Sequence, residues 1–359
     1  MLQSASRSKI SLKLKFLLRF GLFGGPNPFE IEEAAFDTDG WTALFNEAKS
    51  HAVTALLYDA IMQLPQHQRP PRILMLQLGC SVAEIEDSCR QMETAAIALS
   101  DLVTQKSHSE NKIVLTVVKG PAIALHYPIP NHREYSDIDL LTLGETERIG
   151  RIIEETGISV DCSDPRHASF VFKDVVFECH NYLLYTSDEH QWNIVPFTED
   201  KSDRLSCFNR LPVEEEAFFL AKHMEHHAVF FHQNVPLRSL VDWAMLTNDP
   251  EFDFNKLDVL KRDTDVDRFV ILLTLFCKSL FGLPRSYGSA YTLPSGIDAS
   301  DFDRLYMNCP PRHRSAFVRV FRRSWHYLSH TRKYKLLYGK SMFRRFYFSN
   351  LRIAIKQNV

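Results

Sequence analysis

The chain has 359 residues, of which 45% are apolar and 24% are charged. At about 100 to 200 residues per domain, this length suggests two or three compact units, and the composition is that of an ordinary soluble globular protein. Collagen-like, wholly disordered and disulfide-scaffold classes are excluded.

The formal charge of −2 hides a strong asymmetry along the chain. Residues 1–29 contain five Lys or Arg and no acid, and residues 312–359 contain thirteen Lys or Arg and no acid. The middle of the chain therefore carries all 44 acidic residues against 24 basic ones, a net charge of about −20. Basic ends of this kind either meet an anionic partner or fold back onto the acidic body.

Cysteine usage and hydropathy predict a cytoplasmic protein. The seven cysteines form no Cys-x-x-Cys pair, and several lie in apolar runs, which is typical of reduced, buried thiols. The apolar run at 16–23 is interrupted by Arg19, and no small-residue cleavage site follows it. No uncharged stretch of about 18 to 20 residues is present for a membrane span.

The N-terminal region, residues 1–105, is expected to be helical. Apolar residues recur at helical spacing over 41–61, and the Pro-rich stretch at 65–71 ends that unit. A second amphipathic helix is expected over 82–102. We interpret both as packing helices.

Residues 106–205 change in character, because short β-branched apolar runs alternate with helix-permissive segments. The expected elements are, in chain order, a strand at 113–118, a turn into a helix at 119–126, a strand at 138–143, a helix at 148–156 and a hairpin at 169–185 that turns near Lys173-Asp174. This order predicts a small mixed sheet.

Helical spacing returns at Val213 and continues to the end of the chain, with breaks near 249–250, 282–294 and 310–311. Residues 206–359 are therefore predicted to form a C-terminal helical region with a basic, aromatic tail. The expected fold class is α+β, with a small mixed sheet flanked by N-terminal and C-terminal helical regions.

Two carboxylates, Asp137 and Asp139, stand at alternate positions of a predicted strand. Side chains on a strand alternate between faces, so both point the same way, and two adjacent negative charges are unfavourable unless a cation lies between them. Mg²⁺ suits such a pair, because it binds one or two carboxylates and keeps its other positions for water and phosphates. Glu178, near the end of the second hairpin strand, offers a third carboxylate, with His180 on the same face.

An Asp-x-Asp is short enough to recur by chance, but its surroundings favour a metal site. Asp137 begins an apolar strand, where an unused carboxylate is costly. Lys119 and Gly120 stand at a strand-to-helix turn, with Gly120 seventeen residues before Asp137. A glycine at such a turn lets backbone amides approach a phosphate.

Five segments, in this order, carry a resemblance to a known family. The central three are VVKGPAIALHYP with its Lys-Gly, HREYSDIDLLT with Arg133 four residues before the Asp-x-Asp, and FECHN with its Glu-x-His. A helical Trp- and Ala-containing segment precedes them, and a His-rich helix followed by Leu-Arg-x-Leu-x-Asp comes after them. Over residues 41–246 the chain thereby resembles the uncharacterised nucleotidyltransferase family, a branch of the DNA polymerase β-like nucleotidyltransferase superfamily. It departs at the first turn, where Gly120 is followed by Pro121 instead of the more common Ser, which removes a hydroxyl and a backbone donor.

The resemblance implies a nucleotidyltransferase core that works with two Mg²⁺ ions. Asp137 and Asp139 would hold the ions, and Glu178 would complete the metal site or act as the base. Lys119 and Arg133 would pair with phosphate oxygens of ATP or another nucleotide.

In this interpretation AMP passes from ATP to a hydroxyl of a small molecule, a protein or an RNA end, and pyrophosphate leaves. Gly120 and His180 would also lie at the nucleotide site. For Arg133, the alternative is a salt bridge to Glu134 or to an Asp of the pair. The alternative function is a non-catalytic module that binds a nucleotide or acts in assembly on the same scaffold.

Four histidines crowd one segment, and His223 and His227 form an i, i+4 pair on one helix face. That spacing can bind Zn²⁺, as in a metallohydrolase, but such sites need a third ligand, and the His-Glu-x-x-His order is absent. We expect instead that His223 lines the nucleotide cleft or hydrogen-bonds to Arg238 and Asp242, themselves an i, i+4 pair. His223 and Arg238 are therefore candidates for the nucleotide site.

The tail from Arg312 onward interleaves its bases with aromatic residues. Single-stranded RNA or an anionic membrane surface would be bound by such a pattern. Amphipathic helices that dock on the acidic body of the same chain have the same pattern, so both interpretations stay open.

Overall fold

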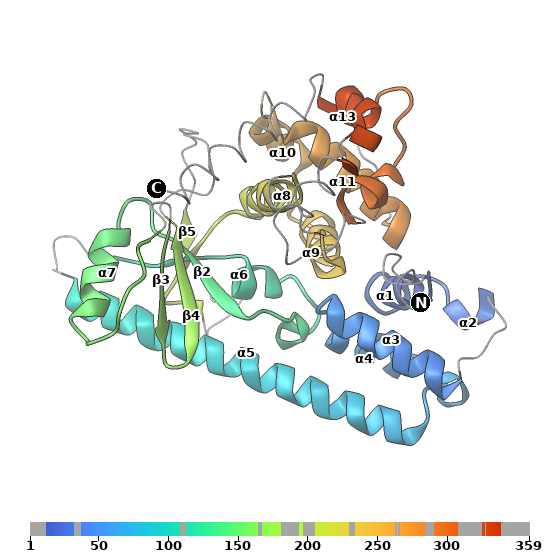
Figure 1. Ribbon diagram of the computed structural model, residues 1–359. Coiled ribbons are helices and arrows are strands. Elements are labelled where there is room, and N and C mark those ends of the chain that lie inside the picture. Colours follow the sequence, from blue (N-terminus) through green and yellow to red (C-terminus); the bar gives the residue numbers. More distant parts are fainter. Residues whose placement is uncertain are drawn as a thin grey trace.

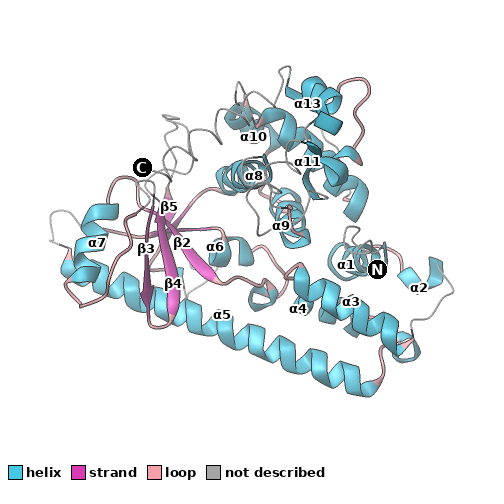
Figure 2. Cartoon of the chain, viewed as in Figure 1, coloured by secondary structure: helices cyan, strands magenta, loops and turns pink. Residues whose placement is uncertain are grey.

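A six-stranded mixed sheet lies at one end of the molecule, and helices cover it and extend away from it (Figures 1 and 2). This computed structural model describes residues 12–31, 37–107, 113–163, 167–180, 194–196, 205–229, 234–262, 264, 266–283, 291–307, 325–326 and 328–338. The fold is α+β, as the sequence predicts.

The strand order is β3-β4-β2-β1-β6-β5. The central strand β2 pairs with β1 antiparallel and with β4 parallel, while β3 and β4 form an antiparallel hairpin. At the other edge, β6 pairs parallel with β1 and antiparallel with β5. The strands are β1 (Thr116–Val118), β2 (Asp137–Leu141), β3 (His167–Phe172), β4 (Val175–His180), β5 (Val195–Pro196) and β6 (Asn209–Arg210).

The predicted hairpin turn is confirmed at Lys173-Asp174. Both residues have positive φ, 48° and 62°, which is the backbone geometry of a two-residue turn that matches the twist of the flanking strands. The short strands β5 and β6 were not predicted, because two-residue strands carry no periodic pattern. The predicted hairpin continues to residue 185, and its last five residues lie outside the described residues.

Alternation along β2 sorts its side chains onto two faces of the sheet. Ile138 and Leu140 point into an apolar core that they share with α5 (Arg72–Lys106) and α7 (Thr146–Glu154). The carboxylates of the strand stand on the other face. One face of the sheet is therefore covered by packing helices, and the opposite face carries the polar groups.

Helix α5 connects the two cores of the molecule. It has 35 residues, more than the sequence pattern predicts, and runs past the sheet and on past α3 and α4 (Figure 1). Leu99 and Val103 pack against the sheet, whereas Leu74 and Leu78 belong to a second, helical core.

The helical core combines segments from both ends of the chain. Leu17 of α1 and Leu57 of α4 belong to the same buried cluster as Trp243 of α9 and Phe269 of α11. The two predicted helical regions therefore share one core; the boundaries near residues 105 and 205 stay predictions. The helices are α1 (Leu12–Phe23), α2 (Pro28–Ile31), α3 (Thr38–Ser50), α4 (Thr54–Met62), η1 (Gln66–Gln68), α6 (Gly120–Ala124), η2 (Pro130–His132), α8 (Val213–Val229), α9 (Leu237–Asn248), α10 (Phe254–Lys261), α11 (Asp267–Phe281), η4 (Asp303–Met307) and α13 (Thr331–Tyr338).

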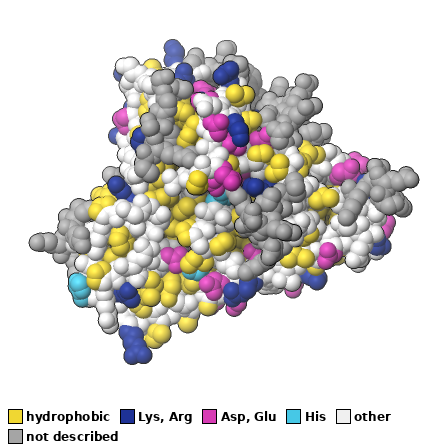
Figure 3. All heavy atoms as spheres, turned by 180° about the vertical axis from the view of Figure 1, so that it is seen from behind, with side chains coloured by type: hydrophobic (Ala, Val, Ile, Leu, Met, Phe, Trp, Pro, Cys, Tyr) yellow, Lys and Arg dark blue, Asp and Glu magenta, His cyan; other side chains and the backbone are white. Residues whose placement is uncertain are grey.

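The described residues bear on the predictions about membrane spans, thiols and charge. None of the described helices is both long and apolar enough to cross a membrane. Every described cysteine is a free thiol. On the face seen in Figure 3, acidic and basic side chains are interspersed instead of gathered by sign. Most of the basic tail lies outside the described residues.

Candidate functional site

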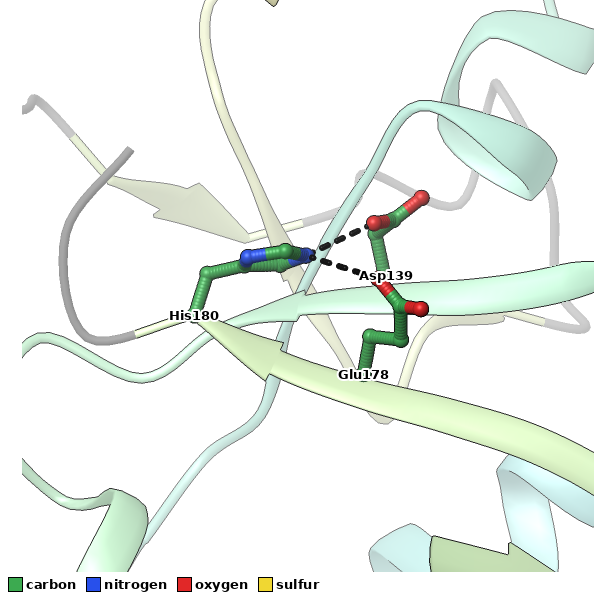
Figure 4. Close-up of side chains that lie close together, drawn as sticks. All are labelled: Asp139, Glu178 and His180. Atoms are coloured by element: carbon green, nitrogen blue, oxygen red, sulfur yellow. Dashed lines mark hydrogen bonds and ion pairs between the residues drawn. The ribbon is translucent and has the colours of Figure 1, made fainter. Parts of the chain in front are cut away.

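Asp139 and Glu178 lie side by side on neighbouring parallel strands, because their Cα atoms are register partners in β2 and β4. His180 lies on the same face of β4. Its Nε2 is 2.8 Å from Asp139 Oδ1 and 3.6 Å from Glu178 Oε2 (Figure 4). One ligand atom from each of these three residues lies within 4.8 Å of the others. The sheet thus brings together, from two strands, a group with the size and chemistry of a metal site.

Asp139 also forms an ion pair with Lys119, the residue that follows β1. The Nζ atom of Lys119 is 2.7 Å from Asp139 Oδ1, and both side chains are largely buried. Burial by itself raises the pKa of the Asp139 carboxyl, but Lys119 and His180 outweigh burial and hold that pKa well below its usual value. Asp139 is therefore a carboxylate at any pH at which the protein would work.

Asp137 faces the same site from the beginning of β2. Burial raises the pKa of its carboxyl, and the negative charges of Asp139 and Glu178 raise it further, while Lys119 and Arg238 act in the opposite direction. Repulsion between carboxylates of this kind favours binding of a cation among them. The register puts Asp139 beside Glu178, whereas the group of three neighbouring ligand atoms contains His180 and not Asp137. The metal role of Asp137, Asp139 and Glu178 stays a prediction.

Lys119 has a strained backbone at the junction of β1 and α6. Its φ of 54° and ψ of −126° lie in a region that non-glycine residues rarely adopt. The positive φ thus falls on Lys119 and not on Gly120. A Cβ added at Gly120 would lie 3.5 Å from the backbone oxygen of Asp137, an ordinary van der Waals contact. The lysine, and not the glycine, is therefore the unusual residue of this turn.

Arg133 corrects a sequence-based expectation, because its guanidinium is not free to bind phosphate. The residue is 3% exposed, and Nε and Nη2 donate to the two carboxylate oxygens of Asp242 at 2.7 and 2.8 Å. Nη1 donates to the backbone oxygen of Gly120 at 3.2 Å, and the Tyr127 hydroxyl donates to Asp242 at 2.6 Å. A buried guanidinium needs a carboxylate partner, and Asp242 on α9 supplies it in place of Glu134 or the Asp pair. The pair ties the α6 turn to α9.

Arg238 is likewise placed differently from the expected pair with Asp242. Its Nη1 donates to the backbone oxygen of Glu134 at 2.7 Å. Burial lowers the pKa of Arg238, and the nearby Arg133 lowers it further, while Asp242 and Asp137 counteract this effect. Arg238 therefore adds positive charge close to the site, which keeps it a candidate for the nucleotide.

One face of α8 forms a wall beside the site. Glu216, Phe219 and His223 follow at helical spacing, and Lys119 Nζ lies 5.6 Å from the centre of the Phe219 ring. The ring of His223 is 4.2 Å from that of His227. Burial lowers the pKa of His223, and the positive charges of Lys119 and His227 lower it further, so His223 is a neutral imidazole at neutral pH.

Within the described ranges, His223 and His227 belong to no group of three candidate metal ligands. Among the described residues, the group Asp139, Glu178 and His180 is the one that brings three candidate ligand atoms together. His223 lies on the same face of α8 as Phe219, which the Lys119 ammonium approaches, and its place at the nucleotide site stays a prediction.

Sequence reasoning missed Glu216. It follows two other acids in the first turn of α8, a place where acids are common because they complement the helix dipole. Its spacing of seven residues from His223 was the available signal, because that spacing puts both residues on one helix face.

The comparisons with known proteins bear on what this site does. A family model described as uncharacterised nucleotidyltransferase matches residues 37–282. The chain belongs to the uncharacterised nucleotidyltransferase family. A search of curated proteins finds no match. The family match includes the sheet, the carboxylates, α8 and α9, and it ends just after α11. The site described above thus lies entirely within the part of the chain that defines the nucleotidyltransferase family.

Proposed function

We propose that the protein is a Mg²⁺-dependent nucleotidyltransferase that transfers AMP from ATP to a hydroxyl acceptor and releases pyrophosphate. The observation that carries this proposal is the pairing of Asp139 with Glu178 across β2 and β4 beside Asp137, in a chain of the nucleotidyltransferase family.

The donor set fits a hard divalent cation. Asp137, Asp139 and Glu178 supply oxygen ligands, which Mg²⁺ prefers, and their mutual repulsion is relieved by a cation. His180 hydrogen-bonds to Asp139 and so holds that carboxylate in place. When bound, Mg²⁺ supplies charge neutralisation at the triphosphate and lowers the pKa of the attacking hydroxyl.

The exposure of the two paired carboxylates indicates which of them acts as the base. Asp139 is almost fully buried and already accepts two hydrogen bonds, which makes it a poor base. The Glu178 side chain is 34% exposed and lies at the open side of the group. Glu178 therefore takes the proton of the acceptor hydroxyl while the hydroxyl oxygen forms a bond to the α-phosphorus of ATP. The bond from that phosphorus to the bridging oxygen breaks, and pyrophosphate leaves.

Lys119 provides positive charge for the triphosphate. The Lys119 side chain is 14% exposed, and its Nζ atom lies 2.7 Å from Asp139 Oδ1. Arg133 is not part of this proposal, because Asp242 already occupies its guanidinium.

The test is transfer of label from ATP labelled at the α-phosphate. Purified protein, Mg²⁺ and candidate hydroxyl acceptors are incubated together, and labelled acceptor and pyrophosphate are both measured. The double variant Asp137→Asn, Asp139→Asn should lose both products. Asp101→Asn on α5 is the matched control, since it removes an exposed carboxylate that lies outside the site. Undiminished transfer by the double variant would refute the assignment.

One observation favours the second candidate, a nucleotide-binding module without catalysis. The Lys119 ammonium donates a hydrogen bond to Asp139 Oδ1 and so balances the charge of this carboxylate without a metal. Such a module should be stabilised thermally by ATP to the same extent with Mg²⁺ and with EDTA. A strict requirement for Mg²⁺ in the same assay would argue against it.

A further inference from the structure

Glu216 makes an unusual contact with the turn between β1 and α6, which contains Lys119. The residue is 2% exposed, and its Oε1 accepts a hydrogen bond of 2.6 Å from the backbone N–H of Lys119, 97 residues earlier in the chain. Its other oxygen, Oε2, is buried and has no hydrogen-bond partner in the described parts of the chain. A buried, half-satisfied carboxyl group is costly, so stability alone does not account for it.

The contact falls on the one strained residue of the turn. The positive φ of Lys119 is unfavourable in a non-glycine residue and persists only where the surroundings hold it. The Lys119 carbonyl accepts from the N–H of Ile123 at 2.8 Å, which is a local helical bond. On the N–H side, Glu216 is the group that holds the backbone.

The backbone of Lys119 in turn fixes where its side chain can reach. Lys119 Nζ lies 2.7 Å from Asp139 Oδ1 and 5.6 Å from the centre of the Phe219 ring. Phe219 stands one turn after Glu216 on α8, so the same helix face holds both the backbone and the side chain of the lysine. Lys119 is thus held at its amide by one acid and at its ammonium by another.

We propose that Glu216 is a positioning residue, whose carboxyl group clamps the Lys119 amide and thereby aims the lysine ammonium at Asp139 and the phosphate site. This proposal rests on the proposed function for the role of Lys119, but the clamp itself can be tested without it. Burial raises the pKa of Glu216 to about 8, so its neutral form predominates at pH 7, and Gln is a close mimic of that form.

Three variants at Glu216 separate the clamp from packing. Glu216→Met keeps an unbranched side chain of similar length but cannot accept the hydrogen bond. Glu216→Gln keeps an acceptor oxygen, and Glu216→Asp keeps the carboxyl group but withdraws it by one methylene. Glu214→Met is the matched control, because Glu214 also lies buried in the first turn of α8 and accepts a backbone N–H, that of Asp253, on the side facing α10.

The first readout is amide hydrogen exchange at Lys119 in the full chain, which needs neither metal nor nucleotide. Met and Asp at position 216 should raise exchange there about threefold to tenfold, whereas Gln should leave it within about twofold. Glu214→Met should raise exchange at Asp253 and not at Lys119. Unchanged exchange at Lys119 in both Glu216→Met and Glu216→Asp would overturn the clamp; having both variants keeps the test valid if one does not fold.

The second readout is a double-mutant cycle on the affinity for ATP with Mg²⁺, measured by calorimetry. Glu216→Met should weaken binding about threefold to tenfold, and Glu216→Gln should restore it. In the Lys119→Ala background, Glu216→Met should cause no further loss, because the ammonium it positions is gone. An equal loss in both backgrounds would show that Glu216 does not act through Lys119 and would overturn the positioning role.

The two proposals fail differently. If the wild-type chain binds no ATP under any metal condition, the proposed function fails, while hydrogen exchange at Lys119 still decides the clamp. If ATP binds but the exchange and the cycle behave as in the control, the clamp fails and the proposed function stands.

Discussion

Asp139 on β2 and Glu178 on β4 are paired residue for residue in a parallel ladder, and on the other side Asp139 pairs with Val118, the residue before Lys119. Three adjacent strands therefore deliver a lysine, an aspartate and a glutamate to one place. Side-chain alternation then puts the apolar residues of the same strands against α5. The site is a consequence of strand register, and a shift by one residue would bury its carboxylates in the apolar core.

Glu178→Gln should separate catalysis from binding. Gln keeps the size of the side chain but cannot take the proton from the hydroxyl of the acceptor molecule. The value of kcat should therefore fall by about 10² to 10⁴. The KM for ATP should change much less than kcat, because Asp137, Asp139 and Lys119 remain and the Gln amide still offers the cation an oxygen. Steady-state kinetics with a transfer-competent acceptor provides both values, with Asp101→Asn as the control. A rise in KM at unchanged kcat would contradict the role of Glu178 as base.

Arg133→Met should affect folding far more than nucleotide binding. It leaves Asp242 as a buried carboxylate without its bidentate partner, a loss of about 3 to 5 kcal/mol in unfolding free energy. Replacing both partners, Arg133→Met with Asp242→Leu, should recover most of that loss, because no buried charge is left unpaired. Urea unfolding followed by circular dichroism measures both. Unchanged stability together with weakened ATP binding would instead make Arg133 a phosphate ligand.

The sequence predicts those parts of this molecule that depend on local periodicity. The alternation in β2, the hairpin turn at Lys173-Asp174 and the shared face of Asp137 and Asp139 all follow from neighbours in the chain. The length of α5 and the break between α3 and α4 at Ala52, which has a positive φ of 52°, do not, because tertiary packing decides them.

Long-range pairing is where the sequence misleads. Asp242 lies four residues after Arg238, which suggests a helical ion pair, yet Asp242 bonds to Arg133, 109 residues away. Glu216 is similar, because nothing in the first turn of α8 indicates a contact with Lys119. Such partners are chosen by which helices pack together, and one sequence does not contain that information in its local pattern.

His132 should make stability depend on pH. Its Nδ1 is 2.7 Å from Asp59 and its Nε2 is 3.0 Å from Glu86, so it bridges α4 and α5. Burial lowers the pKa of His132, but the two carboxylates more than compensate, and the pKa is raised overall. The stabilisation is therefore complete below the unfolded pKa of about 6.5 and is lost as pH rises through the folded value.

The variant His132→Gln tests this bridge. It should reduce the unfolding free energy by about 1 to 3 kcal/mol at pH 6, and by less at pH 9, because the charge-dependent part of the stabilisation declines as pH rises through the folded pKa. Urea unfolding at both pH values measures the difference. His67→Gln, at a surface position in η1, is the control and should give the same result at both. A loss that is independent of pH would show that His132 acts through packing alone.

Glu216 should also make stability fall as pH rises, over a different pH range from His132. Burial raises its folded pKa to about 8, whereas the unfolded value is near 4.3. Between these values the native state binds more protons than the unfolded state, so the unfolding free energy falls as pH rises, by up to about 1.4 kcal/mol per pH unit. Glu216→Gln has no proton to lose and should escape this decline. Relative to wild type, the variant should therefore gain stability steadily from pH 5 to pH 8.

The measurement is urea unfolding of both proteins in EDTA, at intervals of one pH unit. The difference between the two unfolding free energies cancels the contributions of all other titrating groups. Parallel curves would mean that Glu216 is ionised in the folded protein across this range, which would contradict the burial of a neutral carboxyl group beneath the Lys119 turn.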